Sequence, residues 1–158
     1  MKRAVFPVSF DPLTLGHEDI IKRAASSFDK VMIAVSEDNA KSSIFSVNER
    51  LKMAEIVAKK YTNVSASSFK GLTVDFAKAN AINFILRGLR DSSDFDNEAQ
   101  NALMNKTLDN SIETIFLISS KNVREISSTN VRQILSLAGD VSNFMSTEII
   151  SYINSLKT

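Results

Sequence analysis

The chain has 158 residues, of which 44% are hydrophobic and 23% charged, and its net charge is +1. This length suits one globular domain with a buried core, and the charge gives no bulk attraction to nucleic acid or to a membrane. The chain has no cysteine and one histidine, His17, which excludes disulfide scaffolds, thiol nucleophiles and multi-histidine metal centres. No signal peptide or ~20-residue apolar segment is recognisable. We therefore expect a cytoplasmic protein with no nucleic acid or membrane partner.

Short apolar runs alternate with helical patterns along the whole chain. The predicted elements, in chain order, are a strand over Ala4–Phe6 ended by Pro7, a helix opened by His17, a strand over Val31–Val35, a helix after the capping box Ser46–Glu49, a weak strand over Val64–Ser67, a helix over Leu72–Ala79, a strand over Phe84–Leu86, a helix around Phe95–Leu103, a strand over Ile115–Ile118, a helix from Ser127 or Ser128 to Leu137 ended by Gly139, and a helix over Thr147–Leu156.

Five strands that alternate with helices predict an α/β fold. We expect a single domain over residues 1–158, with a Rossmann-like, doubly wound sheet of five parallel strands and helices on both faces. In such sheets, ligands bind outside the carboxyl ends of the strands. Neither a P-loop nor a G-x-G-x-x-G fingerprint is present, so a nucleotide would have to be held in another way.

Two of the strand exits carry one candidate residue each. The loop after the first strand ends at His17, at a helix start, where unpaired N–H groups and the helix dipole attract phosphate. The alternative is that His17 is only a cap or a surface residue. Lys41 follows the second strand at the same edge of the sheet, and the alternative for it is a solvated surface lysine.

The exit of the fourth strand carries two arginines, Arg87 and Arg90. Guanidinium groups bind phosphate oxygens in a bidentate manner, which makes both residues candidates for an anion site. The alternative is an exposed turn in which they form ion pairs with Asp91, Asp94 or Asp96.

Three consecutive hydroxyl residues, Ser127, Ser128 and Thr129, begin the helix after the fifth strand. N-capping explains one of them but not all three. Four of the five strand exits thus carry groups that suit phosphate. This convergence predicts a site for a phosphate-bearing ligand.

Two motifs carry a resemblance to a known group of enzymes. The segment Thr14–His17 resembles the (T/H)-x-G-H signature of the nucleotidylyltransferase superfamily, and Ile126–Arg132 matches its I-S-S-T-x-x-R signature. Across essentially the whole chain, further segments resemble bacterial phosphopantetheine adenylyltransferases: Ser9–Pro12, Lys41, Phe45 before Glu49 and Arg50, Arg87–Arg90, and Asp94 with Phe95.

The resemblance implies transfer of AMP from ATP to 4′-phosphopantetheine, which gives dephospho-CoA and pyrophosphate in coenzyme A synthesis. It implies Mg²⁺ brought with ATP and a homohexamer. Because the chain offers no dense carboxylate cluster at the strand exits, we expect phosphates rather than protein side chains to hold the metal. The resemblance makes His17 and Lys41 catalytic. The residues implied to hold phosphopantetheine are Ser9, Lys41, Thr73 and Arg87. Those implied to hold ATP are Ser9, Phe10, His17, Gly88, Leu89, Arg90, Glu98, Val123, Arg124, Glu125, Ile126, Ser127, Ser128 and Thr129.

Two positions depart from the pattern of that family. Val8 stands where a glycine is common, and Val123 stands where an aromatic residue is expected. The implied chemistry needs no strong base, because a phosphate monoester is already anionic; positioning and charge stabilisation suffice.

Two other functions remain open from the sequence. One is a sister adenylyl- or cytidylyltransferase with another acceptor, such as an NMN adenylyltransferase. The other is a non-catalytic nucleotide-binding or RNA-binding module, which predicts a strongly basic face or decayed signatures.

Overall fold

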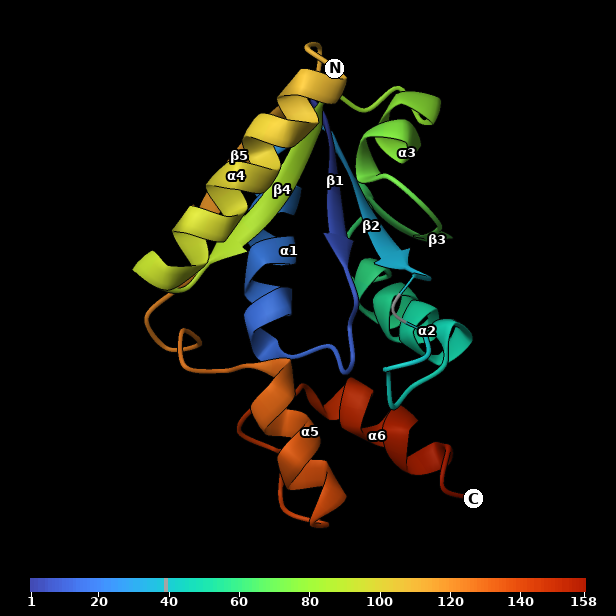
Figure 1. The fold of residues 1–158 in the computed structure, drawn as a ribbon. Helices are drawn as coiled ribbons and strands as arrows, with labels where there is room; N and C mark the ends of the chain where they lie inside the picture. The colour runs from blue at the N-terminus through green and yellow to red at the C-terminus, as the bar shows by residue number, and fades with distance from the viewer. Residues whose placement is uncertain (39) are drawn as a thin grey trace.

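The computed structural model describes residues 1–38 and 40–158 (Figure 1). Within them the strands are β1 (Arg3–Val8), β2 (Lys30–Ser36), β3 (Val64–Phe69), β4 (Phe84–Leu89) and β5 (Glu113–Ile118). The helices are α1 (Leu15–Ser27), α2 (Val47–Ala58), α3 (Thr73–Ala79), α4 (Ser92–Leu108), α5 (Ser128–Ser136) and α6 (Thr147–Ser155). All strand pairs are parallel, in the order β3-β2-β1-β4-β5, so the predicted fold class is confirmed.

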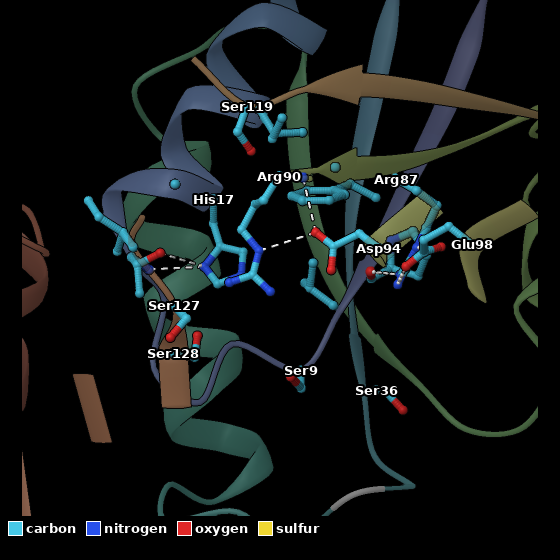
Figure 2. A pocket seen from close by; sticks show the side chains of 18 of the residues that line it. Ser9, His17, Ser36, Arg87, Arg90, Asp94, Glu98, Ser119, Ser127 and Ser128 are labelled. Atoms are coloured by element: carbon cyan, nitrogen blue, oxygen red, sulfur yellow. Dashed lines mark hydrogen bonds and ion pairs between the residues drawn. The ribbon is translucent and has the colours of Figure 1, made fainter. Parts of the chain in front are cut away.

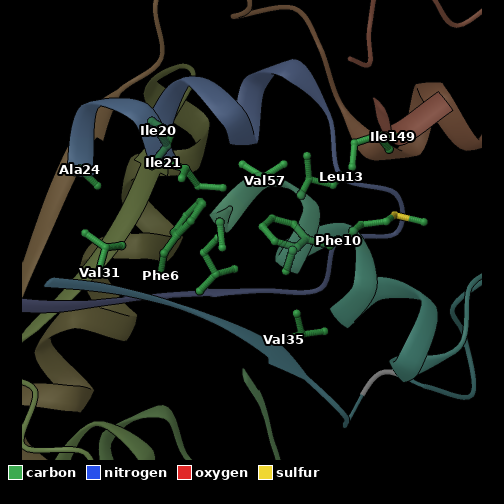
Figure 3. Packing of buried hydrophobic residues seen from close by; sticks show 14 of the residues in the cluster. Phe6, Phe10, Leu13, Ile20, Ile21, Ala24, Val31, Val35, Val57 and Ile149 are labelled. Atoms are coloured by element: carbon green, nitrogen blue, oxygen red, sulfur yellow. The ribbon is translucent and has the colours of Figure 1, made fainter. Parts of the chain in front are cut away.

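Strand side chains alternate between the two faces of the sheet, and on each face buried apolar side chains pack against helices. Phe6 and Ile33 belong to a core shared with α1, α2, α5 and α6. Figure 3 shows Phe6 in this core, beside Ile20 and Ile21 of α1. The adjacent strand residues Val5 and Ala34 point to the opposite face, where they pack with Val74 of α3. On that same face α4 contacts β5 through the rings of Phe95 and Phe116, whose centroids lie 6.1 Å apart. The sheet is therefore doubly wound.

The prediction that Pro7 ends the first strand is wrong, because β1 continues to Val8. Proline is tolerated where its missing N–H has no ladder partner. Pairing of β1 with β4 reaches only as far as Val5, whereas pairing with β2 continues to Val8. The carbonyl of Pro7 instead accepts a hydrogen bond from the Arg87 side chain of β4, at 2.9 Å.

The predicted end of the fourth strand at Leu86 is also wrong. Arg87, Gly88 and Leu89 pair with Phe116–Ile118 of β5 and therefore belong to β4. A glycine between two arginines suggested a turn in the sequence, but the neighbouring strand continues the ladder. As a result, Arg87 projects from the sheet itself, and Arg90 is the first residue beyond it.

The topological switch point of the sheet lies between β1 and β4, the two strands that separate early. From β1 the chain proceeds outward to β2 and β3, then crosses to β4 and β5 on the other side. A crevice at the carboxyl edge between these two halves is the expected ligand site. In Figure 1 the arrowheads of β1 and β2 point towards α5 and α6, which lie beyond this edge.

The predicted helix ends are confirmed at α2 and refined at α5. Ser46 and Glu49 form the capping box, with Glu49 N–H donating to Ser46 Oγ at 3.2 Å and Ser46 N–H donating to the Glu49 carboxylate at 2.7 Å. After α5, Ala138 takes the left-handed conformation with φ of 54°, not Gly139. No helix within residues 1–38 and 40–158 is long and apolar enough to cross a membrane.

Candidate active site

A cavity of about 610 Å³ lies at the carboxyl edge of the sheet. Its walls come from the ends of β1, β2, β3 and β4, the starts of α1, α3, α4 and α5, and the loop after β5. This volume falls in the range of small-molecule sites. The structure brings these predicted site residues together in its lining: Ser9, His17, Thr73, Arg87, Gly88, Arg90, Glu98, Val123, Ile126, Ser127, Ser128 and Thr129.

Five predicted site residues do not line this cavity: Phe10, Lys41, Leu89, Arg124 and Glu125. Phe10 is fully buried, and its ring contacts the edge of the His17 ring with centroids 4.9 Å apart, so it supports the histidine from behind. Lys41 is exposed on the loop before α2. Arg124 and Glu125 are exposed as well, on the loop that leads to α5.

His17 is held in one tautomer by the start of its own helix. The backbone N–H of Thr14 donates to Nδ1 of His17 at 3.0 Å, and Oγ1 of Thr14 lies 3.2 Å from the same nitrogen. Because Nδ1 is the acceptor, the ring proton of the neutral imidazole is on Nε2. Burial, reinforced by Arg90 and Arg87, lowers the pKa of His17 to about 4.

His17 is therefore a helix cap and a cavity residue at once, so the alternative raised by the sequence is true but incomplete. At neutral pH it is an uncharged donor at the start of a helix, where the dipole favours an anion. Figure 2 shows its ring beside the Arg90 side chain, among the polar groups of the cavity.

Arg87 is clamped between two strands and a helix. Its Nε and Nη2 atoms donate to the two carboxylate oxygens of Glu98 at 2.8 and 2.6 Å, and its Nη1 donates to Pro7 O at 2.9 Å. A bidentate pair of this kind fixes the guanidinium plane. Glu98, expected to contact the nucleotide, thus also orients an arginine of the cavity.

Arg90 forms the ion pair with Asp94 that the alternative interpretation anticipated, and it still lines the cavity. Its Nε atom lies 3.3 Å from Asp94 Oδ2, and its backbone N–H donates to the same oxygen at 3.0 Å. Asp94 and Glu98 lie four residues apart on α4, and so on one face of that helix. The helix therefore supplies counter-charges to both arginines (Figure 2).

Each of the three hydroxyls at the start of α5 has a partner within the protein. Ser127 is the N-cap and accepts from the N–H of Asn130 at 3.2 Å. Ser128 Oγ donates to Pro12 O at 2.8 Å, and Thr129 Oγ1 accepts from Arg132 at 3.1 Å. The hydroxyls thus fix the helix start against the loop after β1. The first backbone N–H groups of α5 are the ones available to an anion, since they lack partners within the helix.

Several lining residues were not among the predicted site residues, notably Ser36, Asp94, Ser119 and Arg132. Ser36 ends β2 and Ser119 follows β5, so the rule that placed the other candidates at strand exits would have included both. Arg132, the last residue of the I-S-S-T-x-x-R segment, donates to Asp11 O at 2.7 Å. Three lining arginines against two lining carboxylates leave the cavity wall with a positive balance.

A second, smaller cavity of about 260 Å³ adjoins the first, and Pro7, Gly71, Thr73, Arg87 and Glu98 line both. The rest of its wall consists of apolar and amide side chains with one threonine, namely Leu72, Ile85, Asn101, Ala102, Met104, Asn105 and Thr114. Arg87 thus lies between a polar chamber and a narrower, mostly uncharged one.

Comparison with known proteins places this arrangement in a family. The family model described as cytidylyltransferase-like matches residues 5–134. A phosphopantetheine adenylyltransferase of Clostridium perfringens is 45% identical over 150 residues, covering 95% of this chain and 92% of that protein. A phosphopantetheine adenylyltransferase of Burkholderia vietnamiensis is 48% identical over 142 residues, covering 90% of this chain and 86% of that protein.

The fold also matches a solved structure from Vibrio parahaemolyticus, provisionally named nicotinate-nucleotide adenylyltransferase. Its TM-score is 0.73 over 98% of this chain and 93% of that chain, at 19% sequence identity, which supports the fold alone. The sequence relatives, together with the cavity at the switch point, decide the assignment: the chain belongs to the cytidylyltransferase-like family and, within it, to the phosphopantetheine adenylyltransferases.

Proposed function

We propose that this protein transfers the adenylyl group of ATP to 4′-phosphopantetheine, releasing pyrophosphate and forming dephospho-CoA. The relatives that are 44–48% identical over most of the chain bear that name. The structural observation that carries the proposal is a single cavity where a neutral imidazole, two oriented arginines and two helix starts meet.

The two cavities suit the two substrates if ATP lies in the larger one and phosphopantetheine in the smaller one. ATP would occupy the larger cavity, with its phosphates near His17, Arg90 and the start of α5. The pantetheine arm would occupy the smaller cavity, whose amide and apolar wall suits an amide-containing chain. The acceptor phosphate would then lie at Arg87, which lines both cavities.

This placement of the two substrates supports in-line attack of an acceptor phosphate oxygen on the α-phosphorus, with pyrophosphate leaving on the opposite side. His17 would donate its Nε2 proton in a hydrogen bond to the oxygens of the crowded transition state. A donor held in place beforehand needs no reorganisation during reaction. Replacing such a donor typically lowers kcat by ~10²–10³, so His17→Ala, which removes the donor altogether, should retain ATP binding within a few-fold and lose at least that much activity.

Lys41 remains a proposed participant although it lies outside the larger cavity. It is exposed on the loop before α2, and a lysine side chain is long and flexible. The loop is attached near Lys41 by the Asp11 carboxylate, which accepts the N–H groups of Ile44 and Phe45 at 3.0 Å each. A phosphate placed at Arg87 would offer Lys41 an anionic partner.

We further propose that Mg²⁺ enters with ATP. Among residues 1–38 and 40–158 no group of three His, Cys, Asp or Glu side chains could hold a metal ion. The donor set therefore fits a metal held by phosphate oxygens, which is common for Mg²⁺. The ion would offset charge on the triphosphate, which the modest positive balance of the wall cannot do alone.

Assembly with further copies of the chain is also proposed, as a homohexamer. The helix α4 has no buried residue, and Leu103, Met104 and Leu108 on it are 70%, 61% and 54% exposed. Apolar exposure of this kind is typical of a surface that another protein covers. Light scattering coupled to size exclusion gives the number of copies.

The substrates, ATP and a coenzyme A precursor, favour a cytoplasmic location.

Pyrophosphate release from ATP tests the proposed reaction, with phosphopantetheine, NMN and glycerol 3-phosphate as parallel acceptors. We expect release with phosphopantetheine only, and a product with the mass of dephospho-CoA. Release with NMN or glycerol 3-phosphate instead would identify a sister enzyme. ATP binding without turnover for every acceptor would identify a non-catalytic nucleotide-binding protein.

A further inference from the structure

A carboxylate on α1 holds the loop that follows β5. Oδ1 of Asp19 accepts from the hydroxyl of Ser120 at 2.9 Å, and Oδ2 accepts from the backbone N–H of Ser120 at 3.2 Å. Arg23, one turn further along α1, lies 3.2 Å from Asp19 Oδ2 and donates to Ile118 O at 2.6 Å. One helix thus binds the last residue of β5 and the second residue after it.

The loop held in this way forms one wall of the larger cavity. Ser119 precedes the clamped serine and lines the cavity, as do Val123 and Ile126 further along the loop. The same loop lies against the start of α1, since a Cβ atom added to Gly16 would lie 3.7 Å from Val123 O and 3.8 Å from Ile126 O. In Figure 2, Ser119 lies beside this helix, above His17 and Arg90, whereas Arg87 and Glu98 lie further to the right.

The helix that carries the clamp also carries His17. Only Glu18 lies between His17 and Asp19, so both side chains move with the first two turns of α1. The histidine faces the proposed phosphate position, and the clamp fixes the loop that forms the wall on the proposed nucleoside side. The distance between the His17 side chain and loop 119–126 is therefore set by a rigid helix rather than by a flexible loop.

We propose that Asp19, which itself does not line the cavity, is a positioning residue that fixes the nucleotide-side loop 119–126 relative to His17. This inference rests on the proposed binding of ATP in the larger cavity. Hydrogen bonds to a charged carboxylate are stronger than neutral ones, and this carboxylate is only 18% exposed, so the clamp is well protected from water. Both of its oxygens are engaged with partners distant in sequence.

The test compares Asp19→Asn with wild type in steady-state kinetics and in ATP binding by calorimetry. Loss of a charge-assisted contact typically weakens an interaction by about tenfold. We expect the ATP Kd and KM to rise by about tenfold, while the KM for phosphopantetheine stays within about twofold. Ser120→Ala should act in the same direction, and the double variant should be no worse than Asp19→Asn, because both changes break one contact.

The chain offers a matched control in Asp109. Its Oδ1 accepts from the N–H and the hydroxyl of Ser111 at 2.9 and 2.6 Å, so it also binds both groups of a serine, but locally, just before β5 and away from the cavity lining. Asp109→Asn should leave the ATP Kd unchanged, even if it lowers the melting temperature as much as Asp19→Asn does.

Three results would overturn the proposed positioning role of Asp19. They are an unchanged ATP Kd in Asp19→Asn, an equal rise of both Michaelis constants, and an equal effect in Asp109→Asn. The calorimetric measurement keeps the clamp separable from the reaction. If the wild type binds ATP and transfers nothing to phosphopantetheine, the proposed acceptor is wrong, and the ATP Kd values still decide the role of Asp19.

Discussion

Protonation of His17 can be followed directly, because it is the only histidine in the chain and gives a single set of imidazole resonances. Burial and the two neighbouring arginines lower its pKa to about 4 from the ordinary value of 6.5. We expect the imidazole resonances of the ligand-free protein to titrate near pH 4. Above that pH, the nitrogen shifts should report the proton on Nε2, since Nδ1 accepts from the Thr14 N–H.

The lowered pKa makes a signed contribution to folding stability. Between pH 6.5 and about 4, the unfolded chain binds a proton at His17 that the folded chain does not, so unfolding is favoured as the pH falls. The contribution is fully present above pH 6.5 and is lost as the pH falls to about 4. At ~1.36 kcal/mol per pH unit, it amounts to about 3 kcal/mol.

The variant His17→Gln isolates this contribution from that of the carboxylates. A glutamine at this position completes a Thr-x-x-Gln capping box with Thr14, so the start of α1 should be retained. Urea unfolding between pH 4.5 and 7.5 measures the free energy of both proteins. The wild type should lose stability more steeply than the variant as the pH falls. Parallel curves, or an imidazole midpoint near 6.5, would refute the buried neutral histidine.

The remaining predictions concern the substrate cavities and one helix end. Arg87→Ala should mainly raise the KM for phosphopantetheine and Arg90→Ala that for ATP; if neither constant changes in either variant, the two arginines only form surface ion pairs. Lys41→Ala should depress turnover while calorimetry shows ATP still bound; an equal loss of ATP affinity would place Lys41 on the other substrate. Gly139→Ala should lower stability by ~1–3 kcal/mol in denaturant unfolding, because the new Cβ would lie 2.7 Å from Ile134 Cγ2; an unchanged midpoint would show that the side chain yields freely.

The sheet could be predicted from the sequence because its strands are buried on both faces and therefore appear as apolar runs. Strand ends could not, because a partner strand decides them. Pro7 lies within β1 only because β4 has already separated from it, and Gly88 lies within β4 only because β5 continues beside it. Both strand ends therefore depend on a neighbouring strand and not on the sequence around Pro7 or Gly88.

The cavity could be anticipated because the carboxyl ends of parallel strands meet at one edge, whatever else the chain does. The ion pair of Arg90 with Asp94, four residues on, could be anticipated as well, whereas that of Arg87 with Glu98 depends on how α4 packs against the sheet, which no spacing in the sequence encodes. Arg50 shows the same limit. It occupies a polar position of an ordinary helical pattern, yet it is fully buried and donates to Ser9 O and Ser36 O at 2.6 and 2.9 Å, at the ends of β1 and β2.

The stereochemical course at the α-phosphorus tests the central claim, direct transfer between two substrates positioned in one site, most directly. ATP carrying a sulfur atom on a chiral α-phosphorus would be turned over with phosphopantetheine, and the configuration of the product determined by phosphorus NMR. A single in-line displacement predicts inversion. Retention would require two displacements, and therefore an adenylylated protein side chain, with His17 the first candidate. That result would contradict a site in which His17 acts only as a hydrogen-bond donor.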